Sequence, residues 1–254
     1  MHTPDEYIAV FDSGVGGISV LRELVKLMPE ENYLYFGDSA NAPYGKRTTD
    51  QVRQLTLDAA AMLRQRGIKA FVVACNTATA AAINDLRAAY PDDIIIGIEP
   101  ALKIASDRFP GGTVGVMATP ATLREEKFAR LLSRFADHCR VVKLPAAGLV
   151  ELVEAGKGNG AEAEALLRPL LAPYCGKLDA VVLGCTHYPF AGEAISRLLG
   201  QDTVLLDGGA GTARETRRRL EAAGLLHDGP GEVLIENSSG CTDMTARCYA
   251  LLEG

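Results

Sequence analysis

Short apolar segments alternate with longer amphipathic segments along this chain, and that alternation constrains the fold more than any other feature of the sequence. Each apolar segment has the length and composition of a buried strand, and the segments between them are long enough for helices. Strands alternating with helices are typical of an α/β fold with mostly parallel sheets. We expect strands at 7–11, 33–36, 70–74, 94–98, 113–117, 140–143, 180–183, 203–206 and 233–236, and helices that include 50–66, 122–135, 161–171 and 242–252.

The two halves of the chain repeat one pattern. The segment at 9–14 has a counterpart at 115–120, 106 residues later, and Cys75 has a counterpart in Cys185, 110 residues later. The nearly equal offsets predict two similar α/β units, related by a pseudo-twofold axis and facing each other across a cleft. We place the first unit at residues 1–97 plus 208–254 and the second at 98–207, because the Asp-Gly-Gly-Ala-Gly stretch at 207–211 has the composition of a hinge.

Each repeated cysteine ends an apolar run and opens a turn that we expect to start a helix. Ligands in α/β folds bind at the carboxyl ends of strands, where both turns fall. The positive end of a helix dipole favours a thiolate, which is the reactive form of cysteine. Asp12, at the end of another expected strand, could reach Cys75, and His187 follows Cys185 by two residues. Two opposed thiols could remove a proton from one face of a carbon and return one to the other.

Other functions remain open on these residues alone. A Cys–His pair also suggests a hydrolase or acyltransferase with a covalent intermediate, although such an enzyme leaves Cys75 without a role. The glycine-rich turn at 11–17 could bind an anion, or it could belong to a dinucleotide-binding fingerprint with Asp38 at the ribose. Against the fingerprint, Ser19 occupies the position of the third glycine. A non-catalytic amino-acid-binding protein would also keep the hinge and the anion-binding turns.

Composition and charge narrow the classes of partner. The net charge is −6 and no cluster of Lys and Arg is present, so we expect no nucleic-acid-binding surface. No apolar stretch approaches the roughly 20 residues of a membrane span, and the first residues do not resemble a signal peptide. We therefore expect a cytoplasmic protein with six reduced cysteines. We expect neither a metal nor a cofactor, because no metal-ligand spacing and no lysine for pyridoxal phosphate occur in the repeated turns.

Four segments in this order resemble the glutamate racemases of the cofactor-independent aspartate/glutamate racemase family. They are Phe-Asp-Ser-Gly-Val-Gly-Gly at 11–17, Gly-Asp-Ser at 37–39 with Ala-Pro-Tyr-Gly at 42–45, Ala-Cys-Asn-Thr-Ala at 74–78, and Gly-Cys-Thr-His-Tyr-Pro at 184–189. The resemblance implies a two-base transfer of the Cα proton of glutamate. It assigns Cys75 to D-glutamate with help from Asp12, and Cys185 to L-glutamate with help from His187 and Glu154.

The resemblance implies further properties of the chain. It implies substrate-binding roles for Asp12, Ser13, Tyr44, Gly45, Asn76, Thr77, Thr119, Thr186 and His187. It also implies a homodimer and a supply of D-glutamate for peptidoglycan synthesis, cell wall biogenesis and cell shape. Two segments depart from the family pattern. The segment at 144–148 lacks the usual Ala-Cys-Pro, which leaves Glu151 as an alternative to Glu154, and the tail at 237–241 carries no functional assignment.

Overall fold

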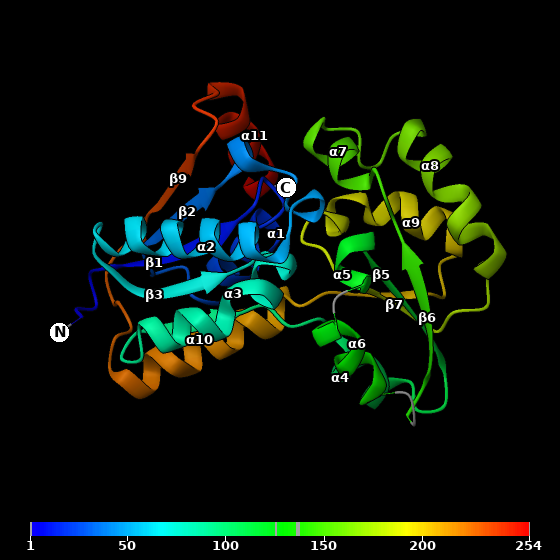
Figure 1. Cartoon of the computed structure of the whole chain (residues 1–254), viewed down its shortest axis with the longest axis horizontal. Coiled ribbons are helices and arrows are strands. Elements are labelled where there is room, and N and C mark those ends of the chain that lie inside the picture. Colours follow the sequence, from blue (N-terminus) through cyan, green and yellow to red (C-terminus); the bar gives the residue numbers. More distant parts are fainter. Residues whose placement is uncertain (1, 125, 136–137, 254) are drawn as a thin grey trace. The chain divides into compact units, whose positions relative to one another are not determined.

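The chain forms two compact α/β units, each with its own parallel sheet (Figure 1). The fold is that of a computed structural model, which describes residues 2–124, 126–135 and 138–253. The first unit lies within Met1–Glu99 and Gly209–Gly254, and the second within Pro100–Gly208. The expected α/β class, with a mostly parallel sheet in each unit, is confirmed.

The sheet of the first unit has five parallel strands in the order β4-β3-β1-β2-β9. They span Tyr7–Asp12 (β1), Tyr33–Gly37 (β2), Ile68–Val73 (β3), Ile94–Gly97 (β4) and Val233–Asn237 (β9). All of β3 and all but the first residue of β1 are buried. Strands in the middle of a parallel sheet are covered on both faces, which is why they appear in the sequence as continuous apolar runs.

Helices cover both faces of this sheet. They span Ile18–Leu27 (α1), Thr49–Arg64 (α2), Asn76–Ala89 (α3), Gly209–Ala223 (α10) and Thr242–Glu253 (α11). Side chains alternate between the faces of a strand. Ala9 and Phe11 of β1 share a core with α2 and α3, so Ile8 and Val10 point to the opposite face, where α1 packs against α10 and α11. A capping box of Thr48 and Gln51 starts α2.

The second unit repeats this arrangement with four parallel strands in the order β6-β5-β7-β8. The strands span Thr113–Ala118 (β5), Arg140–Pro145 (β6), Ala180–Leu183 (β7) and Val204–Leu206 (β8). The strand order matches β2-β1-β3-β4 of the first unit. The helices are Leu102–Arg108 (α4), Pro120–Arg124 (α5), Glu126–Ser133 (α6), Leu149–Glu154 (α7), Ala161–Leu171 (α8) and Gly192–Leu199 (α9).

The expected strands all form, with ends that differ by at most two residues from the prediction. Helices expected at 50–66, 161–171 and 242–252 are present as α2, α8 and α11. The helix expected at 122–135 corresponds to α5 and α6, and residue 125 between them lies outside the described residues. Among the described helices, none is both long and apolar enough to cross a membrane.

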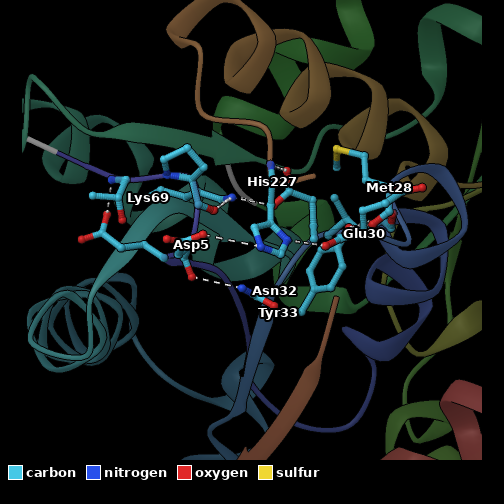
Figure 2. Close-up of polar contacts among 12 residues, drawn as sticks. Asp5, Met28, Glu30, Asn32, Tyr33, Lys69 and His227 are labelled. Atoms are coloured by element: carbon cyan, nitrogen blue, oxygen red, sulfur yellow. Dashed lines mark hydrogen bonds and ion pairs between the residues drawn. The ribbon is translucent and has the colours of Figure 1, made fainter. Parts of the chain in front are cut away.

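A buried polar cluster holds the segment before β9 at the end of the first sheet where its strands begin (Figure 2). Lys69 of β3 lies 2.5 Å from Glu31, and both side chains are almost fully buried. Lys69 also donates a hydrogen bond to the carbonyl of Pro4. The other oxygen of Glu31 accepts the backbone N–H of His227 at 3.0 Å, and the ring of His227 lies 2.7 Å from the carbonyl of Glu30. The cluster therefore joins the N-terminal segment, the start of β2 and the segment that leads into β9.

Candidate active site

The first cysteine lies just beyond the carboxyl end of β3 and is the N-terminal cap of α3. Cys75 has an extended backbone, and Asn76 and Thr77 begin the helix. The sulfur is buried and accepts a hydrogen bond from the backbone N–H of Ala78 at 3.4 Å. A donated N–H and the positive end of the helix dipole both stabilise negative charge on sulfur. This turn therefore suits a cysteine that acts as a base.

The glycine-rich turn after β1 lies beside this cysteine. Phe11 of β1 pairs with Val73 of β3, so the two strands end side by side. Cys75 Sγ lies 3.6 Å from Ser13 Oγ, close enough for a hydrogen bond that involves sulfur. Asp12 is fully buried at the end of β1. The two turns of the first unit thus bring the thiol together with a hydroxyl, at the sheet edge where ligands bind in α/β folds.

The side chain of Asp12 occupies the glycine turn from within. Its Oδ1 accepts the backbone N–H of Gly14 at 3.0 Å. A Cβ on Gly17 would lie 2.5 Å from the Cβ of Asp12, so only glycine leaves room for this carboxylate. A pyrophosphate would need the N–H groups of this turn as donors, and the negatively charged Asp12 already accepts one of them and would repel it. This geometry argues against the dinucleotide alternative.

The loop between β2 and α2 holds Tyr44 and Gly45. Tyr44 is buried, and its hydroxyl donates a hydrogen bond to Asp38 Oδ2 at 2.7 Å. The other oxygen of Asp38 accepts the side-chain N–H of Asn41 at 3.1 Å. Burial and the neighbouring Asp38 carboxylate raise the pKa of Tyr44, so its hydroxyl keeps its proton and remains a donor. Both oxygens of the Asp38 carboxylate therefore accept hydrogen bonds from side chains of the loop.

The second cysteine follows β7 in the same way, but its turn does not start an α-helix directly. A short 3₁₀ segment at Tyr188–Ala191 comes first, and α9 begins only at Gly192. Pro189 explains the difference, because it has no N–H and cannot make the bond to the Cys185 carbonyl that Thr79 makes to the carbonyl of Cys75 at 2.9 Å. The N–H of Tyr188 donates to the Cys185 carbonyl instead, at 3.1 Å. A helix therefore follows both cysteine turns, as expected, but after Cys185 it begins at Tyr188 and starts as a 3₁₀ segment, whereas α3 begins directly after Cys75.

Cys185 contacts His187, and His187 in turn contacts the carboxylate of Glu154. The Sγ of Cys185 lies 3.8 Å from Nδ1 of His187, and Nε2 of His187 lies 2.7 Å from Glu154 Oε1. His187 is 3% exposed, and Glu154 is the last residue of α7. In the neutral ring, a carboxylate at this distance accepts a hydrogen bond from Nε2–H, which leaves Nδ1 as the acceptor that faces the sulfur. Of the two carboxylates left open by the sequence, Glu154 lies in hydrogen-bond contact with His187.

Tyr188 packs behind this turn. It is fully buried, and its hydroxyl donates to the carbonyl of Ala146 at 3.0 Å. Burial raises its pKa well above the usual value, and the nearby Cys185 and Glu151 add to the rise. The side chain therefore stays neutral and fixes the turn to the end of β6.

Two threonines named from the sequence also lie at the carboxyl edge of the second sheet. Thr119 follows β5, and its hydroxyl accepts the backbone N–H of Thr122 at 3.2 Å. This contact satisfies an N–H in the first turn of α5. Thr186 is buried between Cys185 and His187. Thr119 thus has a structural contact of its own, in addition to the binding role that the sequence suggested.

The segment at 237–241, to which the sequence assigned no function, contacts the loop that holds Tyr44. Asn237 ends β9, and its amide donates a hydrogen bond to Ser39 Oγ at 2.8 Å. Asn237 could have been identified from the sequence as a polar residue at the carboxyl end of an expected strand, the same pattern that identified the two cysteine turns. Among the described residues, no group of three or more His, Cys, Asp and Glu side chains could hold a metal ion.

Comparisons with known proteins place the chain in a class of enzyme. The family model of Asp/Glu/Hydantoin racemase matches residues 8–216. The chain belongs to this family, and it is an amino-acid racemase, an isomerase.

Within that family the similarity is to glutamate racemases. The glutamate racemase of Clostridium botulinum (strain Alaska E43 / Type E3) is 47% identical over 97% of this chain and 96% of its own length. The Thermus thermophilus glutamate racemase, solved with β-chloro-D-alanine, is 37% identical with a TM-score of 0.83, over 99% of this chain and 94% of that one. The Escherichia coli enzyme, solved with L-glutamate and the activator UDP-MurNAc-ala, is 30% identical with a TM-score of 0.82, over 97% and 95%. The resemblance seen in the sequence motifs is confirmed.

Proposed function

We propose that this protein interconverts L- and D-glutamate without a cofactor, using Cys185 and Cys75 as two bases for opposite faces of Cα. The observation that carries the proposal is the matched placement of the two thiols. Each follows the equivalent strand, β3 or β7, among the four strands that are ordered alike in the two sheets. Glutamate as the substrate is supported by the glutamate racemases to which the chain is similar.

The reaction removes one proton from Cα of glutamate and adds one proton to the opposite face of the same carbon. From L-glutamate, the Cys185 thiolate takes the Cα proton, and the electron pair left on Cα delocalises into the α-carboxylate. The Cys75 thiol then gives its proton to the opposite face, which yields D-glutamate. The reverse reaction starts from the Cys75 thiolate. His187, backed by Glu154, is suited to hold the proton of Cys185, and Asp12 is proposed to do so for Cys75.

The remaining assignments belong to the same proposal. We assign substrate contacts to Asp12, Ser13, Tyr44, Gly45, Asn76, Thr77, Thr119, Thr186 and His187. The D-glutamate would supply peptidoglycan synthesis in the cytoplasm, and the enzyme would act as a homodimer. Sedimentation equilibrium at several protein concentrations tests the dimer, and a single species of 27.0 kDa would contradict it.

The decisive experiment follows each glutamate enantiomer in D₂O without added cofactor. With the wild-type enzyme, the glutamate solution should lose its optical rotation, and the glutamate should incorporate deuterium at Cα. Cys75→Ala and Cys185→Ala should each lose racemisation in both directions by about 10²- to 10⁴-fold, the usual contribution of a proton-transfer group. Cys175→Ala removes an exposed thiol and should be unaffected. Full racemisation by either of the first two variants would contradict the two-base assignment. Binding of glutamate without exchange at Cα would show a non-catalytic binding protein.

A further inference from the structure

The loop between β2 and α2, residues 38–48, is held by contacts that come from outside the loop as well as from within. It contains only two short 3₁₀ turns, at Ser39–Asn41 and Tyr44–Lys46. Inside the loop, Asp38 holds Tyr44 and Asn41, and Arg47 Nε donates to the carbonyl of Asn41 at 2.6 Å. These bonds shape the loop but do not fix it to the sheet.

The loop is attached to β1, where the backbone N–H of Asp38 donates to the carbonyl of Asp12 at 2.9 Å and Tyr44 packs against Phe11. A second attachment comes from the C-terminal part of the chain. Strand β9 runs parallel to β2 in a register that pairs Asn237 with Gly37, where the loop begins. The backbone N–H of Ser238 donates to the carbonyl of Gly37 at 2.9 Å. The side chain of Ser238 accepts the backbone N–H of Ala40 at 2.9 Å, and Asn237 Nδ2 donates to Ser39 Oγ at 2.8 Å. Each of these bonds joins segments about 200 residues apart in the sequence.

The orientation of the Asn237 amide is determined by its own neighbours. Its Oδ1 accepts two hydrogen bonds from Ser239, one from the backbone N–H at 3.0 Å and one from the hydroxyl at 2.6 Å. The oxygen is therefore used within the tail, and the amide nitrogen is left to donate to Ser39. A short local turn thus prepares Asn237 to hold the loop.

The same amide lies beside the glycine-rich turn after β1. A Cβ on Gly37 would lie 3.1 Å from Asn237 Nδ2 and 2.7 Å from the carbonyl oxygen of Gly14. That carbonyl accepts a hydrogen bond from the hydroxyl of Tyr35 at 2.6 Å. Asn237 therefore lies near the glycine-rich turn after β1 as well as the β2–α2 loop.

We propose that Asn237 and Ser238 are positioning residues, which hold the β2–α2 loop in the conformation that binds substrate. They act through Ser39 and Ala40 on the adjoining Asp38–Tyr44 pair, and they touch neither thiol in any contact described above. The inference rests on the proposed function, because it takes Tyr44 as part of the glutamate site. A loosened loop should weaken substrate binding more than it slows proton transfer at sulfur.

The test compares Asn237→Ala, Ser238→Ala and the double variant with Glu236→Gln. Glu236 lies on the same strand and is paired with the exposed Arg66, away from the loop. In the double variant we expect KM for glutamate to rise on the order of 5- to 30-fold, as the loss of two hydrogen bonds predicts, with kcat changed less than about twofold. Ser238→Thr keeps the hydroxyl acceptor and should restore KM to within about twofold of the wild-type value, while Glu236→Gln should leave it unchanged.

Hydrogen–deuterium exchange supplies a readout that does not depend on activity. The backbone N–H of Ala40 should exchange faster in Ser238→Ala and in the double variant, and at the wild-type rate in Glu236→Gln. Unchanged exchange and unchanged KM in the double variant would overturn the proposal, as would equal changes in Glu236→Gln. If the wild type fails to racemise glutamate, the proposed function fails, and the exchange rates alone still decide whether the tail holds the loop.

Discussion

At the scale of single residues, the role proposed for Cys185 depends on the contact between His187 and Glu154. The carboxylate holds the buried ring so that Nδ1 faces the sulfur of Cys185 at 3.8 Å. Removing the negative charge would weaken the preference for this tautomer and for a protonated ring beside a thiolate. Because the ring is proposed to assist the thiol rather than to take the Cα proton itself, removing Glu154 should cost less activity than removing the thiol.

We expect Glu154→Gln to lower kcat/KM for glutamate by about 10- to 100-fold. The equilibrium constant of a racemisation is one, so kcat/KM must fall equally in the two directions, and only kcat and KM taken separately can differ. Glu151→Gln, three residues earlier on the same helix, is the matched control and should change kcat/KM less than about threefold. Polarimetry from each pure enantiomer measures these values, and wild-type activity in Glu154→Gln would remove this carboxylate from the mechanism.

At the scale of elements, β9 has a role at both of its ends. Its carboxyl end meets the β2–α2 loop, and the segment before its amino end joins the polar cluster around Lys69 and Glu31 (Figure 2). Charges buried at this depth are stable only as a pair, because the low dielectric penalises a charge that has lost its partner. The pair therefore links β3 to the segment that precedes β2.

We expect Lys69→Met to lower the free energy of unfolding by about 3–5 kcal/mol, because it leaves the Glu31 carboxylate buried without its cation. The double variant Lys69→Met with Glu31→Leu should recover most of that loss. Lys157→Met, which removes one partner of an exposed pair, is the control and should leave the unfolding midpoint unchanged. Urea denaturation measures all three variants. A loss below about 1 kcal/mol in the single variant would show that the pair does not stabilise the fold as described.

At the scale of the whole molecule, buried tyrosines in both units couple stability to alkaline pH. Burial raises the pKa of Tyr33, Tyr44 and Tyr188 above the value of about 10 that they have in the unfolded chain. Above that pH the unfolded chain releases protons that the folded chain keeps. The contribution is therefore fully present below pH 10 and is lost as the pH rises further.

We expect the free energy of unfolding to be insensitive to these tyrosines up to about pH 9.5 and then to fall. The slope should reach at most about 1.4 kcal/mol per pH unit for each of them. Tyr33→Phe should reduce the slope by at most about 1.4 kcal/mol per pH unit, and the exposed Tyr249→Phe should leave it unchanged. Urea midpoints between pH 8 and 11 provide the measurement, and a stability that rises above pH 10 would contradict the assignment.

The sequence by itself determined the α/β class, the order and approximate ends of the strands, and the two cysteine turns. These features depend on local patterns, since a central parallel strand needs a continuous apolar run and a turn follows it directly. The tertiary structure decided which side chains meet. Glu151 and Glu154 lie on one face of a single helix, so their spacing could not distinguish them, and only the position of α7 brings Glu154 to His187. Likewise, only the pairing of β9 with β2 brings Asn237 to Ser39, because hydrogen bonds between segments about 200 residues apart leave no periodic trace in a sequence.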